Sequence, residues 1–285
     1  EFNGTHLTVV VSNVNGIANG TYYVKGTSNN PREYLCKGVA GGFCSEPVIQ
    51  LCNGYSANNG CFSTATTNGV TTLTIAGKSM PPGVVWFNGN LMLSNGIYYN
   101  TFVATGNIAT GGSFVSYALN YAAAYKTSPS DTTRKNAVCK NEFDTSVKSN
   151  DFATLYPTNY CGSDGKYTPN ALGNIGLLAG GYNPAANPNT KIIYSGGFIE
   201  LGASNSIYGT VVAGNLLKTG GSTKVYGYIS AAGLQVSDAD NNLGGSTTVD
   251  VTNLPEGYKP NEIPDMSGGA AGVLAEARVL WSRYL

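Results

Sequence analysis

The sequence is short of charge and of histidine. Only 11% of its 285 residues are charged, Lys and Arg balance Asp and Glu at 16 each, and His6 is the single histidine. Proteins that bind nucleic acid displace counterions with clustered Lys and Arg, and this sequence has no such cluster. We therefore expect no DNA or RNA partner. A single histidine also gives almost no support to Ser-His-Asp or Cys-His nucleophile systems.

Motifs for phosphate and metal binding are missing as well. The sequence has no GxxxxGKS/T phosphate loop and no CxxC pair, which argues against a nucleotide cofactor and against a zinc site. We accordingly assign no catalytic residue, no cofactor and no metal ligand.

Long apolar runs and a signal peptide are also absent. No stretch approaches the roughly 20 apolar residues that span a bilayer, and no basic and then apolar signal sequence opens the chain. Glu1-Phe2 is the dipeptide that an EcoRI cloning site encodes. We therefore expect a natural N-terminal segment, either a signal or a membrane anchor, to precede this sequence, and membrane contact only through that segment.

Six cysteines lie in stretches rich in Gly, Asn and Ser. They are Cys36, Cys44, Cys52, Cys61, Cys139 and Cys161. An even number in such stretches indicates disulfides and an oxidising compartment. We predict a Cys139–Cys161 bridge because both residues lie in one irregular insertion, and we expect the first four cysteines to pair among themselves.

The last third of the chain repeats itself every eighteen residues, over 191–206, 209–224 and 227–242. Three apolar columns result when these segments are aligned. They are Ile193, Val211 and Ile229; Phe198, Leu216 and Leu234; and Ile207, Val225 and Leu243. Self-similarity at a fixed period is typical of a solenoid, in which stacked coils bury their equivalent positions together.

A fainter copy lies earlier, at a spacing of seventeen residues. Val85, Leu91 and Ile97 recur as Phe102, Ile108 and Phe114. Segment 101–107 also resembles segment 210–215. One interrupted solenoid explains both regions.

The repeat length predicts the shape of a coil. Eighteen residues at about 3.3 Å each suit three short strands joined by corners, and successive coils then pair as parallel strands about 4.8 Å apart. Ser195, Ala213 and Ala231 form a small-residue column inside. We predict an all-β fold, a parallel β-helix of about 17–18 residues per coil with a disulfide-braced insertion. Right-handed winding is favoured for parallel crossovers.

Two outward pairs follow from the same alignment. Glu200 lies over Lys218 as an exposed ion pair worth at most about 1 kcal/mol. Tyr208 lies over Tyr226. Stacked tyrosines can bind sugar rings, but an aromatic ladder of this kind is more often structural. These two tyrosines are our candidate ligand-facing residues.

We predict a single β-solenoid domain over 1–285. Within it we expect a Cys-rich loop region at 30–68, an insertion at 120–190 and a C-terminal cap or tail at 250–285.

Local patterns predict further elements. β-Branched and aromatic residues with Asn-Gly turns predict an opening hairpin, and alternation predicts a strand before the first coils. Two short patterns inside the insertion predict a brief helix and another coil. The ranges are 6–11 with 21–26 for the hairpin, 71–76 for the strand, 121–125 for the helix and 170–182 for the coil.

Two segments outside the repeats keep two interpretations each. Structureless loops longer than about 15 residues are uncommon unless functional, so the insertion at 120–190 is either a functional element or a lateral cap over one face. The apolar tail at 270–285 is expected to dock, either as the terminal cap that solenoids need or as a surface for another subunit. Its apolar contacts are Leu274, Val279, Leu280, Trp281 and Leu285.

Acidic residues give weak signals. β-Helical polysaccharide lyases and hydrolases need clustered carboxylates or a basic residue on one outer face, and the repeated coils show no acidic column. Asp238 and Asp240, followed by Asn241 and Asn242, offer alternate oxygen ligands for Ca²⁺ but lack the later Glu and fixed Gly of an EF-hand loop. A solvated turn is the favoured interpretation.

Four runs in the coils combine Gly-Asn pairs with aliphatic residues. They are Trp86-Phe87-Asn88-Gly89-Asn90-Leu91, Ala104-Thr105-Gly106-Asn107-Ile108, Leu172-Gly173-Asn174-Ile175 and Ile207-Tyr208-Gly209-Thr210-Val211-Val212-Ala213-Gly214-Asn215. These runs resemble polymer-forming β-solenoid segments, most of all those of bacterial surface proteins associated with type IV pilus assembly. The resemblance covers about half of the chain and implies an extracellular, filament-associated subunit or adhesin.

The leading hypothesis is a non-enzymatic β-solenoid on the bacterial cell surface that binds a surface or a glycan, with pilus or other filament subunits as further partners. The alternative is a carbohydrate-active β-helix enzyme. The second alternative, an ice-binding solenoid, requires regular threonine rows, but Thr210 and Thr219 lack threonine at the equivalent positions of both neighbouring coils. Specificity is expected where the repeat fails: in the Cys-rich start, the insertion and the Trp281 tail.

Overall fold

The structure is a computed structural model that describes residues 2, 4, 6–54, 60–124, 136–139, 152, 154–182, 194–233, 240–252 and 254–255. About half of these residues lie in β-strands, and the helices among them are short. Within these ranges, no helix combines the length and the apolar character needed to cross a bilayer.

The chain begins with an antiparallel sheet in the order β1-β2-β3-β6. The strands are β1 (Thr8–Val11), β2 (Gly20–Thr27), β3 (Asn30–Cys36) and β6 (Pro47–Gln50), with a small hairpin of β4 (Val39–Ala40) and β5 (Phe43–Cys44) between the last two. The predicted opening hairpin is confirmed, because β1 and β2 pair antiparallel. The Cys-rich region at 30–68 is held by disulfides as predicted, but it is not a loop region, because β3 to β6 and a further strand over Phe62–Thr67 lie there.

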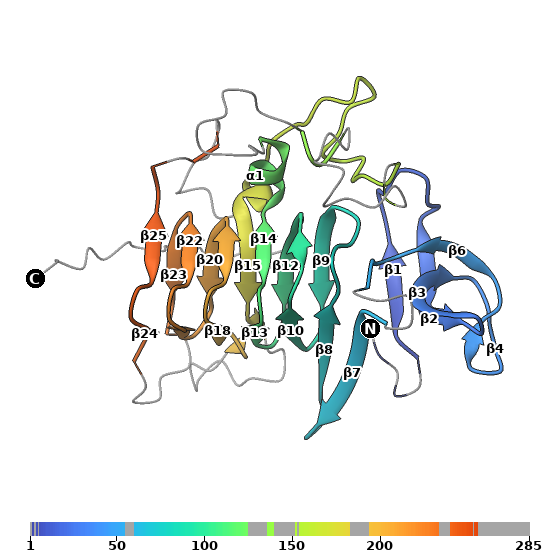
Figure 1. The fold of residues 1–285 in the computed structure, drawn as a ribbon, viewed down its shortest axis with the longest axis horizontal. Coiled ribbons are helices and arrows are strands. Elements are labelled where there is room, and N and C mark those ends of the chain that lie inside the picture. The colour runs from blue at the N-terminus through green and yellow to red at the C-terminus, as the bar shows by residue number, and fades with distance from the viewer. Residues whose placement is uncertain are drawn as a thin grey trace, which may run out of the picture.

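Three stacked parallel sheets follow, and they confirm the β-helix (Figure 1). The first sheet contains β8 (Val70–Ala76), β10 (Asn90–Ser94), β13 (Ile108–Gly111), β18 (Ile199–Leu201), β21 (Leu217–Thr219) and β24 (Asn242–Leu243), with β7 (Phe62–Thr67) antiparallel to β8 at one edge. The second sheet contains β9 (Gly83–Phe87), β12 (Asn100–Ala104), β15 (Ile175–Ala179), β20 (Thr210–Ala213) and β23 (Ile229–Ala231). The third sheet contains β11 (Ile97–Tyr98), β14 (Val115–Tyr117), β19 (Ser206–Tyr208), β22 (Lys224–Tyr226) and β25 (Thr248–Asp250).

The core lies inside the coils, where equivalent side chains stack on one another. In the first sheet, Leu91, Ile108, Ile199 and Leu217 follow one another in register, and all four are buried. Burying such a side chain stabilises the fold by about 1.5–3 kcal/mol. These ladders are what hold successive coils together.

The first apolar column is confirmed in its second half. Val211 pairs with Ile229, but on its other side Val211 pairs with Leu177. Ile193 lies outside the described residues. Chain from the predicted insertion therefore supplies the strand that the alignment assigned to 191–195.

The small-residue column needs the same correction. Ala213 pairs with Ala231 on one side and with Ala179 on the other. Ser195 instead pairs with Gly181 in a short antiparallel hairpin of β16 (Gly181–Tyr182) and β17 (Tyr194–Ser195).

The other two columns are corrected as well. Ile207 and Val225 stack as predicted, but the next residue in their column is Val249, while Leu243 lies beside Thr219 in the first sheet. The last coil is longer than eighteen residues, so an alignment at a fixed period of eighteen assigns the wrong residue to this column.

The predicted column of Phe198, Leu216 and Leu234 is also wrong at one position. The Phe198 side chain is exposed, whereas the alignment placed it inside. The backbone N–H of Ile199 donates to the carbonyl oxygen of Leu216, so the two coils are adjacent here. Leu234 lies outside the described residues.

The earlier repeat is confirmed at two of three positions. Val85 pairs with Phe102, and Leu91 pairs with Ile108. Ile97 pairs with Val115 and not with Phe114. The corner before β14 has one residue more than the corner before β11, so the spacing becomes eighteen.

A tight corner joins the third sheet to the second. Gly209 and Gly227 lie there one coil apart, with φ of +148° and +154°. A Cβ on Gly227 would lie 2.6 Å from the carbonyl oxygen of Gly209. Glycine is required because no side chain fits between coils stacked this closely.

The insertion leaves the stack after β14 and returns at β15. It opens with a helix, α1 (Leu119–Ala123), and closes with a short 3-10 helix, η2 (Ala171–Asn174). The predicted brief helix is confirmed. The additional coil predicted over 170–182 is not: this segment supplies only β15, the second-sheet strand of the coil that continues with β18 and β19. The predicted insertion at 120–190 is therefore divided by β15: one segment lies between β14 and β15, and another between β15 and β18.

Candidate functional site

The cysteines pair as predicted. Cys139 bonds to Cys161, and the first four form Cys36–Cys44 and Cys52–Cys61. Three disulfides are typical of proteins in an oxidising compartment, outside the cytoplasm.

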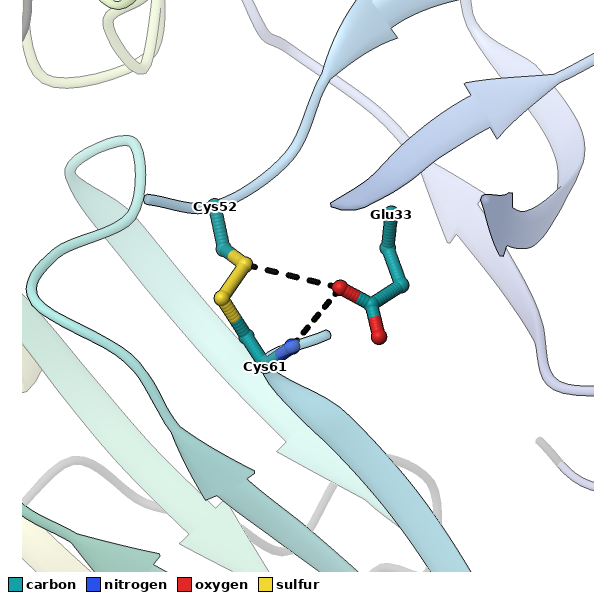
Figure 2. A group of neighbouring side chains, drawn as sticks. All are labelled: Glu33, Cys52 and Cys61. Atoms are coloured by element: carbon teal, nitrogen blue, oxygen red, sulfur yellow. Dashed lines mark hydrogen bonds between the residues drawn. A yellow bond between two sulfur atoms is a disulfide. The ribbon is translucent and has the colours of Figure 1, made fainter. Parts of the chain in front are cut away.

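A buried carboxylate lies against the second disulfide, as Figure 2 shows. Glu33 on β3 is only 7% exposed. Its Oε2 accepts the backbone N–H of Cys61 at 2.8 Å, and its Oε1 accepts that of Phe62 at 3.1 Å. The Sγ atom of Cys52 lies 3.7 Å from Oε2. Burial raises the pKa of the Glu33 carboxyl and outweighs the N–H donors, which lower it.

This group has the residue types of a metal site, but it lacks the free thiolates that such a site needs. The carboxylate and both sulfur atoms lie close enough to share an ion, yet a metal binds thiolates, and both sulfurs are consumed in the disulfide. Glu33 instead joins the N-terminal sheet to the start of β7. We missed it from the sequence, although Glu33 and Leu35 share one side of a strand and Leu35 is buried.

The predicted tyrosine pair is part of a longer ladder on the outer side of the third sheet. The rings of Tyr208 and Tyr226 are stacked, with centroids 4.3 Å apart and an interplanar angle of 8°. Tyr117 stacks on the other face of Tyr208 at 4.2 Å and 10°, and Tyr99 continues the ladder at 5.4 Å. The sequence held a signal for this, because Tyr99 and Tyr117 are also eighteen residues apart.

This stacking restricts what the ladder can bind. A sugar ring packs on the open face of an aromatic ring, but both faces of Tyr208 are covered by neighbouring tyrosines. Tyr226 has one face toward the next coil, where Asp250 is its partner in register. A ligand-facing role for the two tyrosines stays a prediction, now limited to ring edges, hydroxyls and that one face.

The insertion covers the first two tyrosines of the ladder. Tyr99 and Tyr117 pack in one apolar cluster with the Cys139–Cys161 disulfide. The remaining members of this cluster from α1 and beyond are Leu119, Ala122, Ala123, Ala137, Val138, Tyr156, Tyr160 and Tyr167, together with Ile97 of β11. The described part of the insertion is therefore a lateral cap, one of its two predicted interpretations.

Hydrogen bonds join the two ends of the insertion to each other and join its middle to the N-terminal segment. Nδ2 of Asn120 donates to Oδ1 of Asn174 at 2.6 Å, and the hydroxyl of Tyr167 donates to Oδ1 of Asn120 at 2.6 Å. Burial raises the pKa of the Tyr167 hydroxyl, so it stays a donor. Toward the N-terminal sheet, the backbone N–H of Asn15 donates to the carbonyl oxygen of Tyr156.

The outer side of the second sheet carries an exposed strip that we call the Trp86 strip, formed by the apolar side chains of Val84 and Trp86 and the amide side chain of Asn88. Val84 is 38% exposed and Trp86 is 56% exposed, on the edge strand β9. Oδ1 of Asn88 accepts the hydroxyl of Thr105 at 2.9 Å. From 79 to 125 the sequence has no charged residue. The strip is therefore an aromatic and amide surface within an uncharged stretch of sequence. The sequence signal for Trp86 was the alternation along the strand, which places its side chain on the side opposite Val85 and Phe87.

The acidic residues in the described part of the coils do not gather. Glu200 pairs with Lys218 at 3.3 Å, with both side chains largely exposed, which confirms the predicted ion pair. On its other side Glu200 adjoins Ala109. Asp250 belongs to a different sheet. Asp240 is exposed, and Asp238 lies outside the described residues, so the structure gives the calcium hypothesis no test.

The outer side of the first sheet has no threonine row. Thr74 is followed in register by Met92 and then by Ala109. This arrangement gives no support to an ice-binding face. The tail with Trp281, the other predicted site of specificity, lies outside the described residues.

Comparison with known proteins gives no relative to compare these features with: no family model, no curated protein and no solved structure matches the chain.

Proposed function

We propose that this protein is a non-enzymatic extracellular β-solenoid that attaches a bacterial cell to a neutral glycan or a similar uncharged surface, as an adhesin or a pilus-associated subunit. The exposed Trp86 strip carries this proposal. Trp86 and Val84 are exposed side by side on one strand face, and tryptophan is enriched among residues that dominate binding energy.

The scaffold supports attachment. Parallel ladders and disulfides hold β9 and its neighbours in one fixed surface, so little side-chain or loop entropy is lost on binding. The absence of charged residues from 79 to 125 favours an uncharged ligand, because these residues offer a charged polymer no complementary charge. A polysaccharide offers both C–H faces for the indole ring and hydroxyls for an amide such as Asn88.

The test is binding to a panel of immobilised neutral and acidic polysaccharides, with Trp86→Ala and Trp86→Phe variants. Loss of a hot-spot tryptophan is expected to weaken binding by about 2 kcal/mol, or roughly 30-fold. The Phe variant should retain part of the affinity. Affinity should also change little between about 0.05 and 0.5 M salt, because a neutral contact is not screened.

Phe43→Ala is the matched control, because Phe43 is an exposed aromatic residue on β5, away from the strip. It should bind like the native protein. Equal binding by Trp86→Ala would remove the strip from the proposal. Release of products from a polysaccharide would replace attachment with enzymatic activity.

A further inference from the structure

The two ends of the coil stack differ in how well they are closed. At the last coil the inner columns lose their burial: Val225 is 0% exposed, but Val249, its successor in register, is 46% exposed. In the first sheet, Leu201 is 0% exposed and Leu243, two coils later in register, is 54% exposed. The apolar interior therefore continues to an uncovered surface, which we call the open end.

Backbone groups are uncovered at the open end as well. β23, β24 and β25 are each the last strand of their sheet. An edge strand presents unpaired N–H and C=O groups, and together with exposed apolar side chains it is a template for association. Solenoids require a cap at such an end.

The opposite end of the stack already has its cap from the same chain. Leu7 and the Cys52–Cys61 disulfide pack with Met80 in the core cluster of the first coils. Figure 1 shows the N-terminal sheet at that end and β24 and β25 at the other. Chain that precedes the coils thus closes one end, which leaves the chain that follows them to close the other.

The sequence that follows the last coil has the pattern of a cap. Apolar residues in 273–285 recur at the spacing of one helix face. They are Val273, Leu274, Ala277, Leu280, Trp281, Tyr284 and Leu285. Glu276, Arg278, Ser282 and Arg283 fall on the other face, together with the apolar Ala275 and Val279. This segment lies outside the described residues, so the pattern is an argument from sequence.

We propose that segment 273–285 docks on the open end of its own stack through this apolar face, as the C-terminal cap of the solenoid. The described chain leaves the last coil at 251–255, beside the open end, and Val251 there is exposed too. Residues 256–272 can span roughly 55 Å when extended, so the segment reaches the open end easily. A tether of this length gives an effective concentration in the millimolar range, which favours docking within one chain over docking between chains.

The first experiment uses the full chain with Trp86→Phe, so that Trp281 is the only remaining tryptophan. Docking predicts a blue-shifted emission of Trp281 and several-fold weaker quenching by acrylamide than in a free peptide of residues 270–285. Val249→Asp at the open end should shift the emission to the red and restore the quenching. Val10→Asp, at an exposed valine on β1, is the matched control and should change neither.

The second experiment truncates the chain after Pro255. We expect a Tm lower by several degrees and self-association that increases with concentration, because the edge strands are then uncovered. Adding the 270–285 peptide should raise the Tm again, and a peptide with Leu280→Ser and Trp281→Ser should not. Arg278→Ala in the full chain, on the other face of the segment, should leave the Tm unchanged.

Three outcomes would overturn the proposal. Trp281 could be fully quenched in the full chain, which would show that the segment is free. Truncation could leave both the Tm and the monomeric state unchanged. Protection of Trp281 could appear only at concentrations at which the full chain dimerises, which would assign the open end to a second copy. If the truncated chain does not fold, the quenching of Trp281 in the full chain still distinguishes a docked segment from a free one.

Discussion

At the level of single residues, Glu33 joins two parts of the molecule that the chain leaves separate. It comes from the N-terminal antiparallel sheet, and its carboxylate oxygens accept the N–H groups of Cys61 and Phe62 at the start of the coils. The desolvation that raises its pKa is the consequence of this position. A carboxylate in such a place makes stability depend on pH.

Glu33→Gln tests this dependence. Because the folded-state pKa of Glu33 is raised, the folded state holds its proton more tightly than the unfolded state. The free energy of unfolding of the native protein, relative to Glu33→Gln, should therefore increase as pH falls through the folded pKa, and the increase should be complete below the ordinary value of 4.5. Denaturant unfolding at a series of pH values measures it.

Glu46→Gln is the control, because the Glu46 side chain is exposed. It should show no such increase relative to the native protein. A difference between native protein and Glu33→Gln that stays constant across the acid range would contradict the assigned cause.

The tyrosine ladder is the second feature at this level. Tyr208 stacks on two neighbours at 4.2 and 4.3 Å. Stacked aromatic pairs contribute about 0.5–1.5 kcal/mol each beyond area burial. We expect Tyr208→Ala to be less stable than Tyr208→Phe by about 1–3 kcal/mol, measured as free energy of unfolding. Equal stability of the two variants would show that ring stacking contributes nothing.

At the level of elements, the insertion between β14 and β15 is a cap that one disulfide organises. Its described residues pack on Tyr99 and Tyr117 and also contact the N-terminal segment through Asn15. The Cys139–Cys161 bridge lies within that cluster. The insertion thus buries the part of the third sheet nearest the N-terminal end and leaves Tyr208 and Tyr226 partly exposed.

Replacing Cys139 and Cys161 with Ser should destabilise this cap first. Removing a disulfide of this loop size costs about 2–4 kcal/mol. We expect amide exchange to accelerate in α1 and η2 before it does in the parallel sheets. Replacing Cys36 and Cys44 instead, in the N-terminal sheet, should leave the exchange of α1 unchanged. Uniform acceleration in both variants would show that the cap does not open separately.

The elements were predicted from sequence where their pattern is local. β1, β2, β8 and α1 follow from alternation, turn residues and a short helical pattern within each segment. The strands over 30–50 were missed because β4, β5 and β6 are short and because all of them pair around disulfide-linked turns, where Gly and Asn mask the alternation. β15 was placed in the insertion because the chain between β14 and β15 breaks the period.

At the level of the whole molecule, the stack behaves as a one-dimensional array. Each coil contacts only its neighbours, so stability is a sum of terms along the axis. Ile199 lies in the middle of the array, with Ile108 on one side and Leu217 on the other. A defect there should weaken the adjacent coils most.

Ile199→Ala is expected to cost about 2–5 kcal/mol, because it leaves a cavity in a closely packed ladder. The loss of amide protection should be largest in β13, β18 and β21, and smallest in the N-terminal sheet. Val70→Ala, at a largely exposed valine of β8, should cost well under 1 kcal/mol. Equal loss of protection in all sheets would show a single cooperative unit.

The sequence by itself determined the coil. Its interior positions recur at seventeen or eighteen residues, and that recurrence reflects contacts that every coil repeats, so it specifies three parallel sheets, those parts of the inner columns that lie in uninterrupted coils, the Glu200–Lys218 pair and the start of the tyrosine ladder. The cysteine positions likewise indicated Cys139–Cys161.

Only the tertiary structure decided which segments become neighbours across the interruptions. Ladders join strands in space, and a ladder passes unbroken from Tyr117 to Tyr208 although a long stretch of chain lies between them. A fixed-period alignment cannot cross such an excursion, and it placed 191–195 where Leu177 lies and Leu243 where Val249 lies. The burial of Glu33 and the exposure of Trp86 depend in the same way on which surfaces are covered, and that is settled by packing rather than by local pattern.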